Sequence, residues 1–322
     1  MTQSAPLFNR LALIGVGLIG SSIARAARAQ GVVRSIVATA RSAATRTRVA
    51  ELGLADQVVE SNAAAVAGAD LVIVSIPVGQ SGMVAKEIGR HLEPGAIVSD
   101  VGSVKGSVLR DMAPHIPPGV HFVPAHPVAG TEYSGPDAGF AELFVNRWCI
   151  LTPPANADRT AVERLAAFWR ALGANVETMT AEHHDLVLAV TSHLPHLIAY
   201  TIVGTADEFA QVTRSEVLQF SAGGFRDFTR IAASDPTMWR DVFLNNKEAV
   251  LEMLGRFNED LAALTRAIRT GDGETLFDSF TRTRAIRRSI IEVGQETAEP
   301  DFGRRHSAHD AETPLPRPYA SD

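Results

Sequence analysis

Residues 11–31 read LALIGVGLIGSSIARAARAQG, and this stretch decides the expected fold. Its first residues form a short apolar run that suits a buried strand, and the alanine-rich run after them suits a helix. Between the two runs, glycines stand at positions 15, 17 and 20. Glycine has no Cβ and permits a sharp turn from strand to helix. The stretch therefore predicts the opening strand, turn and helix of an alternating α/β domain.

The spacing Gly-x-Gly-x-x-Gly between a strand and a helix is typical of a dinucleotide-binding turn. The first glycine makes the turn, the second lets a pyrophosphate approach the backbone, and the third packs the helix closely on the strand. The alternative is a tight turn that binds nothing. The predicted cofactor-binding residues here are Gly15, Gly17, Leu18, Ile19 and Gly20.

The next apolar run, SIVATA at 35–40, ends without an acidic residue. An Asp or Glu there would bind the ribose hydroxyls and repel a 2′-phosphate. Arg41 and Ser42 follow instead, so we include both among the cofactor-binding candidates and leave NAD and NADP open. The alternative is that Arg41, Arg46 and Arg48 are solvated helix charges.

The first half of the chain continues as short apolar runs separated by helical stretches. This pattern predicts a parallel sheet covered on both faces, closed by a helix and an edge strand over 163–179. The expected strands are 11–15, 35–40, 70–77, 96–102, 121–126 and 148–153.

After about residue 180 the strand-like runs stop. Apolar residues recur at helical spacing over 181–206, 236–268 and 273–294, and Ser234 and Asp235 before Pro236 make a helix start. We therefore predict a Rossmann-type α/β dinucleotide-binding domain over 1–180 and an all-α domain over 181–298. A disordered, polar and proline-rich tail is expected over 299–322.

Composition narrows the classes of protein. The 322 residues are 46% hydrophobic and 20% charged, with a net charge of -6, which suits a soluble globular protein and not a basic nucleic-acid binder. We find no signal peptide and no apolar run of about 18 residues. The single cysteine, Cys149, excludes an intrachain disulfide. We expect a cytoplasmic protein without a membrane or nucleic-acid partner.

A histidine stands where the predicted sheet ends. His126 closes the run 121–126 and opens HPVAGTEYSG, and Ser103 lies in SDVGSVK at 99–105, after the preceding strand. Ligands of open parallel sheets bind outside the carboxyl ends of the strands. Histidine suits the acceptance of a hydroxyl proton at neutral pH. We therefore predict His126 and Ser103 as catalytic residues, with a helix N-cap as the alternative for Ser103.

Several segments together resemble the prephenate/arogenate (cyclohexadienyl) dehydrogenases of tyrosine biosynthesis. They are the glycine loop, DVGSVK, HPVAGTEYSG, HDLVLAVTSHLPHLIA and GGFRDFTRIAASDPTMWRDVFLNNK, within residues 10–295. The resemblance implies oxidative decarboxylation of prephenate to 4-hydroxyphenylpyruvate, of arogenate to tyrosine, or of both. Hydride passes to a nicotinamide cofactor in this reaction. The resemblance also implies a homodimer formed through the helical domain.

The resemblance also implies residue roles. His126 takes the proton of the ring hydroxyl and Ser103 is its hydrogen-bonding partner. Asp227, one turn before Arg230, is our candidate for the ammonium group that arogenate has and prephenate lacks. The other predicted substrate-binding residues are His193 and His196, Glu132 at the mouth of the site, Trp239 near the pocket, and Arg230 on a substrate carboxylate.

Other interpretations stay open. His193 and His184 also suit buried structural histidines, Arg230 an ion pair with Asp227, Trp239 the core, and Glu132 a solvated loop. His193 and His196 are spaced as metal ligands on a helix, but no carboxylate or cysteine completes a set, so no metal is expected. A β-hydroxyacid dehydrogenase would use a lysine of the helical half, such as Lys247. A nicotinamide-binding sensor would need no proton acceptor.

Overall fold

The computed structural model describes residues 5–219 and 223–292. The chain falls into two compact units, residues 1–261 and 262–322, and the first holds both sheets and every residue of the site below. The predicted disordered tail, 299–322, lies outside the described residues. The predicted domain boundary after residue 180 stays a prediction.

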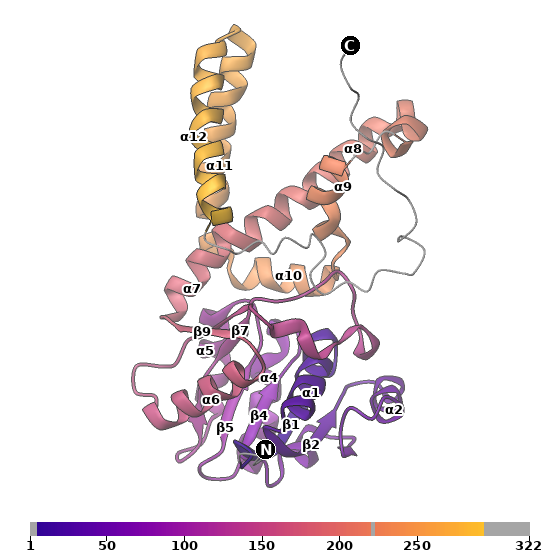
Figure 1. Cartoon of the computed structure of the whole chain (residues 1–322), viewed down its shortest axis with the longest axis vertical. Helices are drawn as coiled ribbons and strands as arrows, with labels where there is room; N and C mark the ends of the chain where they lie inside the picture. Colours follow the sequence, from indigo (N-terminus) through magenta and orange to yellow (C-terminus); the bar gives the residue numbers. More distant parts are fainter. Residues whose placement is uncertain (1–4, 220–222, 293–322) are drawn as a thin grey trace, which may run out of the picture. The chain divides into compact units, whose positions relative to one another are not determined.

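The main sheet has six strands in the order β3-β2-β1-β4-β5-β6, all parallel, and confirms the predicted α/β class (Figure 1). Apolar residues fill its central strands, because helices cover both faces. In its register, Leu11 of β1 pairs with Ile36 and with Leu71. The strands are β1 Phe8–Ile14, β2 Val33–Thr39, β3 Gln57–Val58, β4 Leu71–Val74, β5 Ile97–Asp100 and β6 His121–Phe122.

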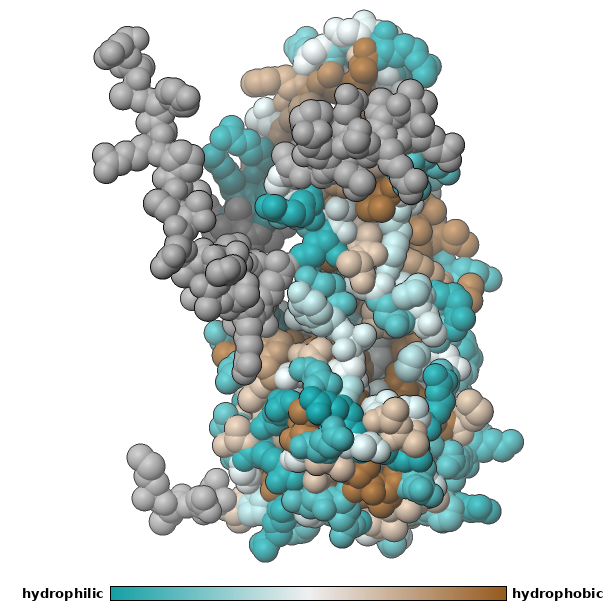
Figure 2. Space-filling view, turned by 90° about the vertical axis from the view of Figure 1, so that its right-hand side faces the viewer, coloured by the Kyte–Doolittle hydropathy of each residue, from teal (hydrophilic) through white to brown (hydrophobic). Residues whose placement is uncertain are grey.

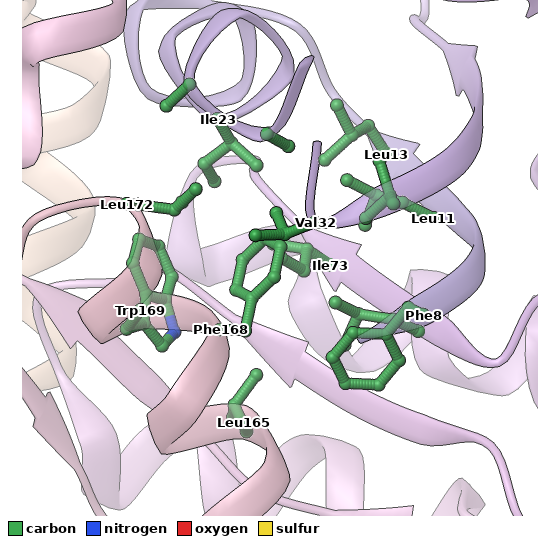
Figure 3. Packing of buried hydrophobic residues seen from close by; sticks show 14 of the residues in the cluster. Phe8, Leu11, Leu13, Ile23, Val32, Ile73, Leu165, Phe168, Trp169 and Leu172 are labelled. Carbon is green, nitrogen blue, oxygen red and sulfur yellow. The ribbon is translucent and has the colours of Figure 1, made fainter. Parts of the chain in front are cut away.

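Alternate residues of β1 belong to two separate cores. Leu11 and Leu13 pack with Ile23 of α1 and with Phe168 and Trp169 of α6 (Figure 3). On the opposite face, Ala12 and Ile14 pack with side chains of α4 and α5. The helices of this half are α1 Leu18–Gln30, α2 Ala43–Glu51, α3 Asn62–Val66, α4 Ser81–Ile88, α5 Lys105–Met112 and α6 Arg159–Ala171.

The predicted strands 121–126 and 148–153 differ from the structure. A second sheet has the order β7-β8-β9, and β7 runs antiparallel to β8. Its strands are β7 Ala125–Pro127, β8 Trp148–Leu151 and β9 Asn175–Thr178. Pro124, which has no N–H to donate, separates β6 from β7, and its carbonyl accepts from Thr152 at 2.9 Å. His126 therefore lies in the small sheet, not at the end of a parallel strand.

The helical half is confirmed, but its first two long helices are interrupted. A π-helical turn, Ala189–His193, precedes Pro195, which cannot donate to the helical ladder. Asn246 separates α10 from α11, and Asp235 caps α10 as predicted. The helices are α7 Ala181–Leu188, α8 Leu194–Gln219, α9 Gly223–Thr229, α10 Pro236–Asn245, α11 Lys247–Thr270 and α12 Gly273–Glu292.

Short 3₁₀ turns connect the regular elements. They are Val78–Gln80, Gly89–His91, Ala113–His115, Pro136–Ala138, Ala141–Phe144 and Arg230–Ala233.

One described helical stretch, Ala181–Glu208, is long and apolar enough to cross a membrane by length and composition alone, although no single run of the sequence suggested one. This is weak evidence, because the segment also carries His184, Asp185 and His193 of the site below. The expected cytoplasmic location, without a membrane or nucleic-acid partner, stays a prediction.

Gly15→Ala is expected to lower the free energy of unfolding by about 2 kcal/mol or more, because φ is +90° and a Cβ would overlap the Ser75 carbonyl. Gly17→Ala is the matched control, since its Cβ would meet no atom within 4 Å. Urea unfolding of both variants measures the difference. Equal stability of the two would contradict the close approach of the turn to β4.

Candidate active site

The glycine loop leaves the N-terminus of α1 open to an anion. Gly15 and Gly20 allow close backbone packing, because a Cβ on Gly20 would overlap the Gly15 carbonyl. A Cβ on Gly17 would enter open space, and no described side chain caps the helix there. A pyrophosphate fits such a place, because the first amides of a helix have no internal acceptor. These amides belong to the predicted residues Leu18 and Ile19 and to Gly20.

The residues after β2 have separate surroundings. Ser42 caps α2 by accepting from the Thr45 N–H at 3.0 Å. Arg46 donates to the carbonyls of Ala40 and Arg41 at 2.9 and 3.1 Å. Within the described chain, the exposed Arg41 side chain makes no hydrogen bond or ion pair. Arg41 is therefore free to meet a cofactor phosphate, whereas Arg46 already holds the backbone of the loop.

Arg48 belongs to a surface ion pair. Its guanidinium lies 2.6 Å from Asp137, and this contact raises the pKa of Arg48 and lowers that of Asp137. The pair joins α2 to the loop that follows HPVAGTEYSG. Because Arg48 already has this partner, it is not a free charge for a cofactor.

His126 is 7% exposed, and its Nδ1 lies 2.8 Å from Nε2 of His184. The Nδ1 of His184 in turn lies 2.8 Å from Oδ1 of Asp185. Burial, followed by the charges of His184, Lys105 and His193, holds the pKa of His126 well below 6.5. His126 is thus neutral near pH 7. We interpreted His184 from the sequence as structural, yet it contacts the predicted catalytic histidine directly.

Asp185 also caps α5. Its two oxygens accept from the N–H groups of Lys105 and Gly106 at 2.7 and 2.8 Å. The N-cap residue of α5 is Val104, so the N-cap interpretation of Ser103 is wrong. Among the described residues, no hydrogen bond joins Ser103 to His126. The catalytic role of Ser103 stays a prediction.

A buried ion pair fixes the backbone beside His126. The Lys105 ammonium lies 2.5 Å from Asp100 and donates to the Ala125 carbonyl at 2.7 Å. Burial lowers the pKa of Lys105, and the Asp100 carboxylate opposes that effect. Asp100 also accepts from the Ala125 N–H at 3.3 Å. The pair therefore holds both polar groups of the residue that precedes His126.

His193 is fully buried beside this group. Asn246 donates to the Asp185 carbonyl at 2.8 Å, and its Nδ2 lies 3.0 Å from Nδ1 of His193. Nε2 of His193 has no hydrogen-bond partner in the described structure. Burial lowers the pKa of His193 to about 4, against opposing contributions from Asp185 and the Ser103 backbone. His193 is thus a fully buried, hydrogen-bonded histidine whose surroundings favour its neutral form.

His196 stacks on Trp239, with ring centroids 3.6 Å apart and planes 23° from parallel. Its Nδ1 lies 2.9 Å from the Ser192 carbonyl, and burial lowers the pKa of His196 to about 4. Trp239 also meets the edge of His193 at 6.1 Å and packs in the core with Val104 and Val242. The structure therefore brings together the three predicted residues His193, His196 and Trp239.

Arg230 lies 3.1 Å from Glu132, so the alternative Arg230–Asp227 pair is wrong. This contact joins the HPVAGTEYSG loop to the turn after α9. Asp227 is exposed and faces Arg226 at 3.7 Å. The structure brings Glu132 and Arg230 together and leaves Asp227 apart from both.

Four residues that organise the site were not among the predicted site residues, and they are His184, Asp185, Lys105 and Asn246. The segment EHHD at 182–185 offered a signal, because it places two histidines between two carboxylates at the start of a predicted helix. Among the described residues, no three histidine, cysteine or acidic side chains gather as a metal site.

Stability is expected to fall as the pH drops from about 6.5 to about 4. His193 charges readily in the unfolded chain below 6.5 but resists charging in the fold, where its pKa is about 4. Such a group contributes stability above its unfolded pKa and loses it as pH falls, by about 3 kcal/mol in total.

Denaturant unfolding at stepped pH measures this slope. His193→Gln is expected to make the slope shallower, because one of four histidines with a lowered pKa is then removed. His183→Gln, on the exposed side of α7, is expected to keep the wild-type slope. Carboxylates do not account for the loss, because those with shifted values titrate below 3.8. If the free energy of unfolding of His193→Gln depended on pH as steeply as that of the wild type, His193 would not be a source of the loss.

Comparisons with known proteins agree with this arrangement. Residues 23–178 match the family model described as prephenate dehydrogenase, nucleotide-binding domain, and residues 180–282 match its dimerization domain. The chain is 42% identical to a cyclohexadienyl dehydrogenase of Zymomonas mobilis over 284 residues, which are 88% of this chain and 97% of that protein.

Two solved structures share the fold. One is prephenate dehydrogenase from Aquifex aeolicus in complex with hydroxyphenyl propionate and NAD+, with a TM-score of 0.81, 33% identity, and coverage of 88% of this chain and 98% of that one. The other is Synechocystis arogenate dehydrogenase, with a TM-score of 0.72, 25% identity, and coverage of 87% and 99%. The chain belongs to the prephenate dehydrogenase family.

Proposed function

We propose that this chain catalyses the oxidative decarboxylation of prephenate, of arogenate, or of both, with transfer of hydride to a nicotinamide cofactor. Membership of the family and the names of its relatives support this reaction. The observation that carries the proposal is the buried, neutral His126, whose Nδ1 is occupied by His184 and whose Nε2 is left for a substrate.

The residues divide the work of the reaction. His126 accepts the proton of the ring hydroxyl at Nε2. The glycine loop of Gly15, Gly17 and Gly20 would hold the nicotinamide cofactor, which would supply the acceptor for the hydride of the carbinol carbon. The ring carboxylate leaves as carbon dioxide as the ring becomes aromatic. The substrate carries two carboxylates, and their negative charge favours the protonated imidazole that His126 becomes. His196 and Trp239 offer a stacked, partly buried wall for the ring.

Arg230 is the proposed partner of the substrate side-chain carboxylate. A guanidinium binds a carboxylate through two parallel hydrogen bonds. A cation that gripped the departing ring carboxylate would oppose its loss, so the side-chain carboxylate is the better partner. Glu132 contacts Arg230 at the same place and orients it. Asp227 stays our candidate for the arogenate ammonium, although it faces Arg226 in this structure.

For the cofactor we propose that NAD and NADP are both accepted. The open space at Gly17 and the uncapped α1 suit the pyrophosphate that both share. Arg41, exposed at the end of β2, suits a 2′-phosphate, and no acidic residue there repels one.

A homodimer is the proposed assembly. Apolar side chains are exposed on the helical half, and Figure 2 shows brown, hydrophobic groups on the surface among the teal ones. Water-exposed apolar faces on long helices usually pair with another chain. The matched dimerization-domain model supports the same assembly. The exposed residues are Ile202, Val203, Leu244, Leu251, Ile268, Phe277, Phe280 and Ile286.

The alternative of a β-hydroxyacid dehydrogenase has less support. Lys247, its candidate lysine, is 60% exposed and faces Glu248 at 3.7 Å. A nicotinamide-binding sensor would need no proton acceptor, so it would not explain the buried hydrogen-bonded chain of His126, His184 and Asp185.

His126→Asn is expected to lower kcat by about 10²- to 10⁴-fold, the usual contribution of a general base, while KM changes little. Steady-state turnover of prephenate and of arogenate, each with NAD and with NADP, measures this and identifies the substrate. The control is His183→Asn, an exposed neighbour of the site. Absence of turnover of both substrates by the wild type would contradict the proposed reaction.

Arg41→Ala is expected to raise KM for NADP by about tenfold or more and to leave KM for NAD nearly unchanged, because only NADP carries the 2′-phosphate. Arg34→Ala, on the opposite end of β2, is the control. Equal effects of Arg41→Ala on both cofactors would exclude a phosphate contact.

A further inference from the structure

The neighbours of His126 form a chain of three polar side chains in the interior. Nδ1 of His126 faces Nε2 of His184 at 2.8 Å, and Nδ1 of His184 faces Oδ1 of Asp185 at 2.8 Å. β7 carries the first histidine, and α7 carries the other two residues. His184 is 0% exposed, so water does not compete for either contact.

The position of each proton in this chain follows from Asp185. Its Oδ1 accepts from the Lys105 N–H and its Oδ2 from the Gly106 N–H, so the carboxylate acts as an acceptor on both sides. His184 must therefore donate from Nδ1 to Asp185. A neutral imidazole that donates from one nitrogen accepts at the other. Nε2 of His184 thus accepts, and Nδ1 of His126 carries the hydrogen.

The remaining nitrogen of His126 is then fixed. With its proton on Nδ1, a neutral His126 has its lone pair on Nε2. The opposite tautomer would set two lone pairs face to face at 2.8 Å in a buried place. Burial lowers the pKa of both histidines, which favours the neutral form of each ring.

We propose that His184, held by Asp185, is a positioning residue that sets the tautomer of the catalytic His126. The inference rests on the proposed function, because it assigns the Nε2 lone pair to the substrate hydroxyl. In the reaction the hydroxyl O–H bond breaks and the Nε2–H bond forms. The Nδ1–H of the resulting imidazolium keeps donating to His184, and no proton travels on to Asp185.

A His184 that served only to fill space would have different requirements from a His184 that sets the tautomer of His126. It would require only that His184 fill its space between β7 and α7. Setting the tautomer of His126 requires a hydrogen-bond acceptor at the position of the His184 Nε2. His184→Gln supplies such an acceptor in its side-chain carbonyl, whereas His184→Phe supplies volume alone.

The test uses the full-length chain with isotope-labelled histidine, and NMR of the ring nitrogens reports each tautomer. His126→Asn identifies the His126 signals by their loss. His184→Gln and His184→Phe are compared with His183→Gln and His183→Phe, the same changes at the exposed neighbour. Circular dichroism confirms that each variant is folded, and kcat and KM are measured on the same samples.

In the wild type, His126 is expected to carry hydrogen on Nδ1 and none on Nε2 near neutral pH. His184→Gln should keep that tautomer and kcat within about tenfold. His184→Phe should lose the tautomer preference and lower kcat by about 10²-fold with KM changed less than about threefold. The His183 variants should match the wild type.

Hydrogen on Nε2 of His126 in the wild type would overturn the proposal, and so would an unchanged tautomer with unchanged kcat in His184→Phe. If His184→Phe does not fold, the wild-type spectrum still tests the proposal, because hydrogen on Nε2 of His126 would overturn it. The tautomer is read without substrate, so failure of the proposed reaction would appear separately, as absent turnover with the predicted tautomer present.

Discussion

The carboxylate of Asp185 is the contact on which the site depends. It accepts from two backbone amides at the start of α5 and faces His184, which in turn contacts His126. One side chain of the helical half thus joins α7 to a helix of the main sheet and to the small sheet. Its charge suits the positive end of the α5 dipole, which favours a carboxylate there. Without the Asp185 carboxylate, the first amides of α5 and the Nδ1 of His184 would lose their acceptor.

The Asp100–Lys105 pair serves the same region from the other side. Burying two charges is costly, and the cost is recovered only where each charge is well hydrogen-bonded. Here both partners also bind the backbone of Ala125, so the pair fixes the direction in which His126 leaves β7. The site is therefore held from the sheet by Lys105 and from the helices by Asp185. Such a double anchor suits a residue whose nitrogen must meet a substrate within hydrogen-bond distance.

Sequence patterns predicted the features that rest on local chemistry. The glycine loop, the buried parallel strands, the Asp235 cap and the change to helices near residue 180 all follow from spacing within a few neighbours. Contacts across long separations were not readable. Asp185 meets Lys105 across 80 residues, and Asn246 meets His193 across 53. Pro124, visible in the sequence, was not recognised as the break that moves His126 into a second sheet.

The proposed mechanism requires that Nε2 of His126 meets the substrate hydroxyl while His184 occupies Nδ1. The most direct measurement is a crystal structure of the enzyme with a nicotinamide cofactor and a hydroxylated ring analogue of the substrate. The analogue hydroxyl is expected within about 3.2 Å of Nε2, with the His126–His184 contact intact. A hydroxyl bound away from His126, or a His126 ring turned off His184, would contradict it.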